Sequence, residues 1–216
     1  IFKKFKNSIN SQKIDKEAVV KVNFQTQTYA NKYRIINWKS NPKKGGGIIN
    51  LFLSHITDYL IFFFGKVRNV ECNINKVKNF EINANCNIEF ISGLKVNIFI
   101  DCDSLKKNHT IQYISKNFKF ILENKGVDYC KKFKFFIIKL NSKNKKEKKE
   151  IISKDPIIKF EKDSRILLSS RIINKTKANF NDKNLKNNIE RYRYNEYVLD
   201  KIRISEKRKI IIKIND

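Results

Sequence analysis

The sequence is poor in residues that build metal sites. Its 216 residues include two histidines, four cysteines, six glycines, two prolines and no methionine. Cys72, Cys86, Cys102 and Cys130 are too far apart for a CxxC motif, and no Cys/His pair has the spacing of a zinc site. We therefore expect no bound metal, and we expect the cysteines to be buried thiols in a reducing compartment.

Signals for export or membrane insertion are also absent. No signal peptide is visible, and polar residues interrupt the longest apolar run, Ile48 to Phe64. A membrane-spanning helix needs about 20 predominantly apolar residues, so this run falls short. We expect a cytoplasmic protein with no membrane contact. The chain begins at Ile1 without a methionine, as a trimmed protein or a fragment would.

Acidic residues are scarce relative to basic ones. The chain has 47 Lys and Arg against 21 Asp and Glu, a net charge of +26. One interpretation is a nucleic-acid-binding module, which would gather lysines on one face with exposed aromatics among them. The lysines are instead scattered along the whole sequence, together with abundant Asn, Ile and Phe. We therefore favour compositional drift and do not expect nucleic acid as the partner.

Alternation of apolar and polar residues predicts many strands and few helices. From Ala18 to Tyr29, Val20, Val22 and Phe24 alternate with polar residues, as in a strand with one covered face. The same pattern predicts strands at 69–75, 85–91, 94–101, 109–114, 118–122 and 133–140, with hairpin turns at Ser92-Gly93 and Ser115-Lys116-Asn117. His109, at the start of one strand, is interpreted as a surface residue.

Helices are also predicted towards both ends of the chain. Apolar spacing predicts helices at 1–13, 162–177 and 185–206, a flexible charged loop at 141–150 and a final strand at 210–214. With 41% hydrophobic residues the chain can bury one core, so we expect a single domain over residues 1–216. The predicted class is α+β: a mostly antiparallel, open-faced sheet with helices packed on one side.

The stretch from Asn41 to Lys66 is where we expect chemistry. Three glycines, Gly45, Gly46 and Gly47, form a turn that opens a helix, and Gly65 is placed to end it. In this helix, spacing predicts a buried stripe and a more polar side. The buried stripe consists of Ile48, Phe52, Tyr59 and Phe63. The polar side consists of Asn50, Ser54, Thr57 and Asp58, and His55 lies at the border between the two. Asp58, three residues after His55, is placed to orient its imidazole.

The segment from Tyr29 to Asn41 is predicted to be a loop that delivers aromatic and polar groups ahead of the glycine turn. It contains Tyr33, Asn37 and the only tryptophan, Trp38. Such a loop suits substrate contact, although burial of one tryptophan to fix the loop explains it equally well.

The order of these features resembles the Gfo/Idh/MocA oxidoreductases. The matching residues are Trp38, Asn41-Pro42-Lys43-Lys44-Gly45-Gly46-Gly47, Ser54-His55-Ile56-Thr57-Asp58 and Gly65, followed by Ser92-Gly93, Asp163-Ser164-Arg165 and Ser205. The resemblance covers nearly the whole chain, but only as the family's C-terminal substrate and oligomerisation domain, which is similar to that of glyceraldehyde-phosphate dehydrogenase. The family's N-terminal Rossmann domain has no counterpart, since neither GxGxxG nor the Glu-Lys-Pro motif occurs.

The resemblance implies the C-terminal domain of an NAD(P)-dependent oxidoreductase that acts on a sugar, polyol or related hydroxyl compound. It implies His55 as the catalytic residue, and Gly45, Gly46 and Gly47 beside the cofactor. The implied substrate-contacting residues are Tyr33, Asn37, Trp38, Lys43 and Asp58. NAD or NADP would be bound mostly outside this chain, which alone should hold no cofactor.

The resemblance also implies two partners besides the small sugar-like substrate. One is an N-terminal nucleotide-binding domain, and the other is a further copy of the chain, joined through the open sheet face. One position departs from the pattern: many members carry an aspartate four residues before the histidine, where this chain has Leu51. That change keeps open a second interpretation, a catalytically degenerate relative that retains the fold for assembly.

Overall fold

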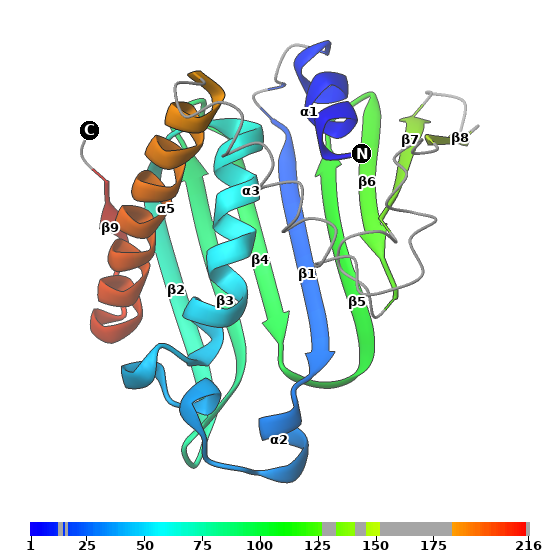
Figure 1. The fold of residues 1–216 in the computed structure, drawn as a ribbon. Helices are drawn as coiled ribbons and strands as arrows, with labels where there is room; N and C mark the ends of the chain where they lie inside the picture. Colours follow the sequence, from blue (N-terminus) through cyan, green and yellow to red (C-terminus); the bar gives the residue numbers. More distant parts are fainter. Residues whose placement is uncertain (13–14, 16, 127–132, 141–145, 152–182, 215–216) are drawn as a thin grey trace.

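A computed structural model describes residues 1–12, 15, 17–126, 133–140, 146–151 and 183–214 of the chain (Figure 1). The helical elements are α1 (Phe2–Asn10), α2 (Tyr29–Tyr33), η1 (Trp38–Ser40), η2 (Pro42–Lys44), η3 (Ile49–Leu53), α3 (Ser54–Phe64) and α5 (Lys183–Arg208). The strands are β1 (Val19–Gln27), β2 (Val67–Val77), β3 (Phe80–Phe90), β4 (Lys95–Asp101), β5 (Asp103–Ile114), β6 (Phe118–Asn124), β7 (Lys134–Leu140), β8 (Lys146–Ile151) and β9 (Ile212–Lys213).

The strands form one nine-stranded sheet in the order β8-β7-β6-β5-β1-β4-β3-β2-β9. β1 lies in the middle, parallel to β4 and antiparallel to β5, and the other neighbouring strands pair antiparallel. Figure 1 shows α1, α3 and α5 on one face of this sheet, and no described helix covers the other. The predicted α+β class, with a mostly antiparallel sheet and helices on one side, is confirmed, as are the β3–β4 and β5–β6 hairpins.

Part of the predicted charged loop at 141–150 is a strand. Residues 146–150 of that predicted loop belong to the edge strand β8 (Lys146–Ile151), which pairs with β7. The run of lysine and glutamate led to the loop prediction. Charged side chains are nevertheless common on edge strands, because they discourage pairing with other molecules. Residues 141–145, the predicted helix at 162–177, the Asp163-Ser164-Arg165 landmark and Cys130 lie outside the described residues.

The covered face of the sheet is apolar and its other face is polar. On β1, Val20 and Val22 are buried, whereas Lys21 between them is exposed. On the polar face, Asn97 donates a hydrogen bond to Asn87 (2.8 Å), and Asn87 donates one to Glu71 (2.9 Å). This division follows from the two-residue period of a strand, and burial of each large apolar side chain stabilises the fold by about 1.5–3 kcal/mol.

The helix predicted between the glycine turn and Gly65 contains a wide turn that the sequence did not reveal. Residues Ile49–Leu53 are π-helical and lead into α3, which ends at Gly65 as predicted, with φ +85°. An i→i+5 turn shifts the phase of the side chains that follow it. The predicted stripe is therefore only partly right: Ile48 and Phe63 are buried, but Phe52 and Tyr59 are half-buried. The buried set also includes Ile49, Leu53, Ile56, Thr57, Leu60, Ile61 and Phe64.

The long helix α5 closes the covered face beside α3. It buries Val198, Leu199 and Ile202 against the core, whereas Ile189 and Tyr192 are exposed. Buried Ser205 accepts a hydrogen bond from the Cys72 amide (3.1 Å) and donates one to the carbonyl of Ile210 (2.6 Å). Ser205 therefore fixes α5 to β2 and to the segment that leads into β9.

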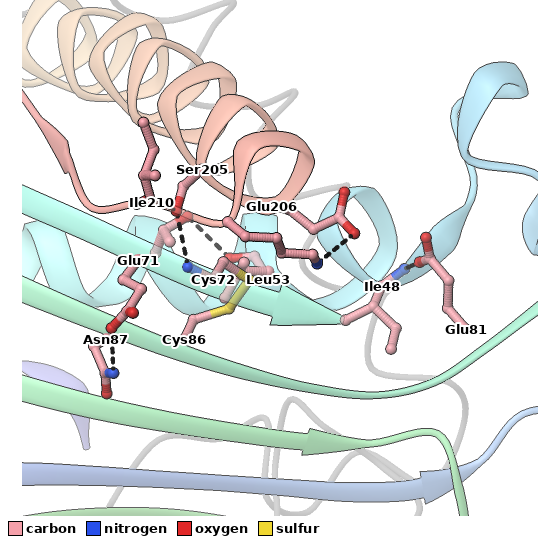
Figure 2. The surroundings of a disulfide bond; sticks show 12 residues. Ile48, Leu53, Glu71, Cys72, Glu81, Cys86, Asn87, Ser205, Glu206 and Ile210 are labelled. Carbon is pink, nitrogen blue, oxygen red and sulfur yellow. Dashed lines mark hydrogen bonds and ion pairs between the residues drawn. A yellow bond between two sulfur atoms is a disulfide. The ribbon is translucent and has the colours of Figure 1, made fainter. Parts of the chain in front are cut away.

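Cys72 and Cys86 do not remain separate thiols in the structure. They face each other on β2 and β3, and their sulfur atoms form a disulfide (Figure 2). The expectation of free thiols is therefore wrong for this pair, because the register places two cysteines of the covered face directly opposite each other. Cys102 is a buried free thiol, as expected. Within the described ranges, no helix combines the length and apolar character that crossing a bilayer requires.

Candidate active site

The glycine turn is shaped by two different constraints. A Cβ at Gly46 would lie 2.2 Å from the carbonyl oxygen of Trp38 and 2.3 Å from that of Lys39, so only glycine fits there. Gly45 and Gly47 have φ of +84° and +80°, a region that glycine adopts without strain. Gly45 has open space at its Cβ position. The turn therefore presents one accessible glycine and two that fix its shape.

A carboxylate on strand β3 holds the end of the glycine turn in place. The Oε2 atom of Glu81 accepts a hydrogen bond from the backbone amide of Ile48 at 2.6 Å (Figure 2), and a Cβ at Gly47 would lie 2.7 Å from the same oxygen. Its other oxygen, Oε1, is 3.7 Å from Nζ of Lys76, which also lies 3.8 Å from Glu206 on α5. Glu81 is thus a buried, paired charge that joins β3 to the start of the helix.

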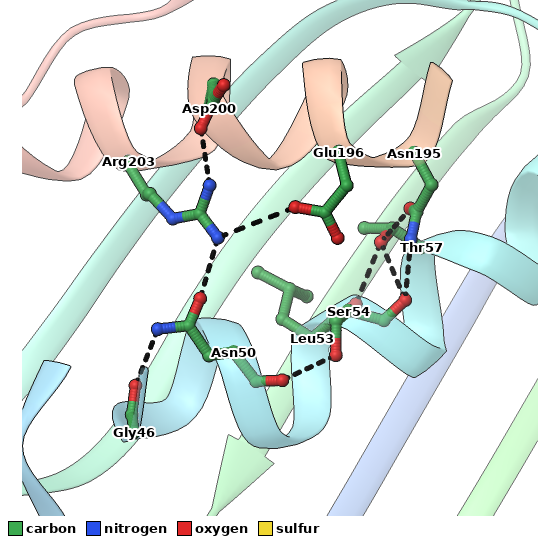
Figure 3. A network of polar contacts seen from close by, with 9 residues as sticks. All are labelled: Gly46, Asn50, Leu53, Ser54, Thr57, Asn195, Glu196, Asp200 and Arg203. Atoms are coloured by element: carbon green, nitrogen blue, oxygen red, sulfur yellow. Dashed lines mark hydrogen bonds and ion pairs between the residues drawn. The ribbon is translucent and has the colours of Figure 1, made fainter. Parts of the chain in front are cut away.

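A second connection reaches the turn from α5. Asn50 donates a hydrogen bond to the carbonyl of Gly46 (2.7 Å) and accepts one from Arg203 (2.6 Å), which also pairs with Asp200 (Figure 3). Further along, Asn195 donates to the carbonyl of Ser54 (3.0 Å). The glycine turn is therefore positioned from both β3 and α5.

A cavity of about 650 Å³ lies between the start of this helix and one end of the sheet. Its lining residues are Thr28, Tyr29, Ala30, Asn31, Asn37, Trp38, Lys39, Ser40, Gly47, Ile48, Leu51, Phe52, Glu81 and Cys102. Burial, followed by the charges of Asp101, Glu81 and Asp103, raises the pKa of the Cys102 thiol, which stays protonated. A mostly apolar hollow of this size with a few polar groups is typical of a small-molecule site.

The predicted loop residues divide between this cavity and the outer surface. Asn37 and Trp38 line the cavity, and the Asn37 side chain caps the short helix η1 by accepting hydrogen bonds from the Lys39 and Ser40 amides. Tyr33 lies at the end of α2, where its ring packs on Tyr29. Lys43 is exposed. The loop thus contains more helical structure than predicted, and Trp38 remains 54% exposed.

The two polar residues predicted on α3 point to different surroundings. His55 is exposed and lies four residues after cavity-lining Leu51, but it is not itself among the residues that line the cavity. Asp58 accepts a hydrogen bond from Arg191 of α5 at 2.8 Å. Among the described residues, no hydrogen bond joins Asp58 to His55. Asp58 thus contributes to docking α5 on α3, and His55 faces outward.

His109 was interpreted as a surface residue, and that prediction is wrong. It is 9% exposed, and its Nε2 shares a hydrogen bond with the hydroxyl of Tyr59 at 2.9 Å. Phe24 and Phe133 pack against its ring. Burial lowers the pKa of His109 to about 4 and raises that of Tyr59. His109 is therefore a neutral core residue under α3.

The buried histidine predicts a pH dependence of stability. In the unfolded chain His109 binds a proton near pH 6.5, but in the folded chain only near pH 4. The unfolded state therefore gains protons first, and stability falls as the pH drops from 6.5 towards 4, by about 3 kcal/mol at most from this group. Urea unfolding at several pH values measures the loss. His109→Gln, which does not titrate, should lose less stability over this window; an identical loss would contradict the assignment.

Sequence reasoning missed Glu81, and the reason is local. On β3 the covered positions are Ala84, Cys86 and Ile88, so strict alternation puts residue 81 on the polar face. The register with β2 shifts between Asn75 and Lys76, which leaves an extra residue on β3. This bulge turns Glu81 towards the covered side, beside Gly47. No signal in the sequence marks such a bulge.

The glycine turn, the helix with His55 and the surrounding sheet can now be compared with known proteins. Residues 6–111 match the family model for the Gfo/Idh/MocA oxidoreductases, C-terminal alpha/beta domain. This chain carries that domain. The matched range includes the glycine turn, α3, strands β1 to β4 and most of β5. A search of curated protein sequences finds no match.

Solved structures share the fold of this Gfo/Idh/MocA domain at low sequence identity. An NAD-binding oxidoreductase from Klebsiella pneumoniae superposes with a TM-score of 0.75 at 13% identity, over 98% of this chain and 62% of that one. Levoglucosan dehydrogenase in complex with NADH and L-sorbose gives 0.73 at 10% identity, over 98% and 62%. The WlbA dehydrogenase from Bordetella pertussis in complex with NADH and UDP-GlcNAcA gives 0.67 at 14%, over 99% and 59%.

The chain corresponds to only part of each of these relatives. The chain spans about 60% of the length of these relatives, and identities of 10–14% establish the shared fold alone. The described residues contain no group of three or more His, Cys, Asp or Glu side chains able to hold a metal ion.

Proposed function

We propose that this chain is the substrate-side domain of an NAD(P)-dependent oxidoreductase acting on a hydroxyl group of a sugar, polyol or related compound. The observation that carries the proposal is the sequence of groups along one helix: Gly47 of the glycine turn and Leu51 line the cavity, and exposed His55 follows about one turn after Leu51. Membership of the oxidoreductase family and the NADH complexes of two dehydrogenases with the same fold support it.

In this proposal the chain supplies the groups that handle the substrate. NAD or NADP would take up a hydride when bound by a nucleotide-binding domain outside this chain. Gly45 is the glycine of the turn with room for a close approach, since nothing lies within 4 Å of its Cβ position. Gly46 and Gly47 would act by fixing the shape of the turn. His55 would accept the proton of the reacting hydroxyl at an imidazole nitrogen.

The remaining predicted site residues would surround the substrate. Asn37 and Trp38 would contact it inside the cavity, whereas Tyr33, Lys43 and Asp58 would act from the surface around it. The open, polar face of the sheet would join a second copy of the chain, since no described helix covers it (Figure 1). The protein would then work in the cytoplasm as an oligomer, with its cofactor held between two domains.

One observation favours a second candidate, a relative that keeps the fold for assembly and has lost catalysis. Leu51 lines the cavity where a carboxylate would assist His55, and an aliphatic side chain cannot accept a proton. A nucleic-acid-binding module is less well supported, because exposed lysines occur on α1, on β1 and β4 in the middle of the sheet, in the β5–β6 turn and on α5. These include Lys3, Lys21, Lys95, Lys116 and Lys207.

A redox assay tests the proposal. We expect the native protein, with its nucleotide-binding domain, to reduce NAD⁺ or NADP⁺ in the presence of at least one member of a panel of sugars and polyols, followed by the absorbance of the reduced nicotinamide. Turnover that depends on both cofactor and polyol supports the proposal. Absence of cofactor-dependent turnover across the panel favours the degenerate relative.

A further inference from the structure

The cavity is lined by a buried carboxylate, although the chain is strongly basic overall. Of the described residues that line it, Glu81 alone carries a carboxylate and Lys39 alone a positive charge. Lys39 is exposed, with its ammonium group over the Trp38 ring, whereas the Glu81 side chain is only 7% exposed. A ligand that fills the cavity would therefore meet the carboxylate in its interior and the cation only near solvent.

The Glu81 carboxylate is held in place but keeps capacity to accept hydrogen bonds. Its Oε2 accepts from the Ile48 amide at 2.6 Å. Its Oε1 lies 3.7 Å from Nζ of Lys76, an ion-pair distance that is longer than a hydrogen bond. An ionised carboxylate has about four lone-pair sites, so a ligand hydroxyl can still donate to it. The charge is fixed by the same contact that positions the glycine turn.

The neighbouring polar groups are already engaged with the backbone. The Asn31 amide donates to the carbonyls of Glu81 (3.1 Å) and Cys102 (3.2 Å). The Asn37 oxygen accepts from two backbone amides of η1. Trp38 and Phe52 add aromatic surface. The strongest remaining interaction that the cavity interior offers is therefore a charge-assisted hydrogen bond to Glu81.

We propose that this cavity binds a neutral, hydroxyl-bearing part of the substrate and that Glu81 excludes ligands carrying a carboxylate or phosphate there. The proposal rests on the proposed function and names its substrate class. A hydroxyl gains a hydrogen bond to the carboxylate, while an anionic group at the same place suffers like-charge repulsion at a buried site. The net charge of +26 by itself attracts anions. Glu81 thus acts as a specificity-determining residue that repels these anions from the cavity.

The only tryptophan of the chain makes this testable by binding alone. Trp38 lines the cavity, so its emission reports on occupancy. The 216-residue chain is titrated with D-glucose and with D-glucuronate at equal ionic strength, and calorimetry repeats the titrations. We expect glucose to bind at least about tenfold more tightly than glucuronate, and Glu81→Gln to reduce that ratio to about threefold or less.

Glu190→Gln, which removes an exposed glutamate of α5, should keep the tenfold ratio. Thermal unfolding shows whether the Glu81→Gln variant is folded. If it is not, Lys39→Gln provides the second test. Loss of the outer cation in that variant should leave the preference for glucose over glucuronate intact. Tighter binding of glucuronate than glucose by the unaltered chain, or no glucose binding up to its solubility limit, overturns the proposal. Failure of the proposed function would appear instead as absent redox turnover with this selectivity unchanged.

Discussion

Under the proposed function, replacing His55 by alanine in the native protein is expected to lower kcat/KM by about 10²- to 10⁴-fold, the usual contribution of a positioned acid–base group. The reason is the position of the imidazole: His55 is exposed on α3, one turn beyond the cavity-lining Leu51. When the carbon that bears the hydroxyl loses a hydride, the hydroxyl must lose its proton, and the residues that line the cavity include no imidazole that could accept it in place of His55. Steady-state kinetics on the identified polyol measure the effect.

The split between kcat and KM distinguishes chemistry from folding. Loss confined to the chemical step lowers kcat with little change in KM. The control is Lys207→Ala, which truncates an exposed side chain near the end of α5. This variant should retain full activity, and its unfolding midpoint should equal that of His55→Ala. A His55→Ala enzyme with undiminished turnover would remove the histidine from the mechanism.

Replacing Gly46 by alanine is expected to destabilise the fold by about 3 kcal/mol, because the new Cβ has no space. It would lie 2.2 Å from the Trp38 carbonyl oxygen and 2.3 Å from that of Lys39. Both neighbours are backbone atoms, so they cannot move away by changing a rotamer. The turn is also hydrogen-bonded to Asn50, which Arg203 holds from α5, so a displaced turn would disturb that contact too.

Gly45 provides the matched control for this substitution. Gly45→Ala meets nothing within 4 Å but must adopt a φ of +84°, which costs about 1 kcal/mol. Urea unfolding of the two variants in parallel separates steric exclusion from backbone strain. Equal destabilisation by the two alanines would show that the carbonyls of Trp38 and Lys39 do not confine the turn as the structure indicates.

Local patterns predicted most of the sheet but not its order. The alternation in β1 and the Ser92-Gly93 turn placed strands and a hairpin correctly, because both depend on neighbouring residues. The pairing of β1 with β4 on one side and β5 on the other joins segments more than 70 residues apart. Periodicity carries no information about such partners, so the central place of β1 could not be predicted from the sequence.

The candidate site shows the same division. The glycine turn and His55 follow from sequence spacing, since both belong to one continuous segment. The π-helical turn at Ile49–Leu53, the bulge that turns Glu81 inward and the pairing of Asp58 with Arg191 depend on how distant elements pack. Consequently, the sequence indicates the segment that carries the candidate site, and the structure adds the cavity beside it.

The fate of the substrate's carbon-bound hydrogen tests the central claim most directly. The native protein is given NAD⁺ or NADP⁺ and a polyol deuterated at the reacting carbon, and the reduced cofactor is examined by mass spectrometry. The account predicts one deuterium on the nicotinamide, formed at the normal rate by the unaltered enzyme and slowly by His55→Ala. A reduced cofactor without deuterium, or no reduction of cofactor by any polyol, would contradict a hydride-transfer site built on the glycine turn and His55.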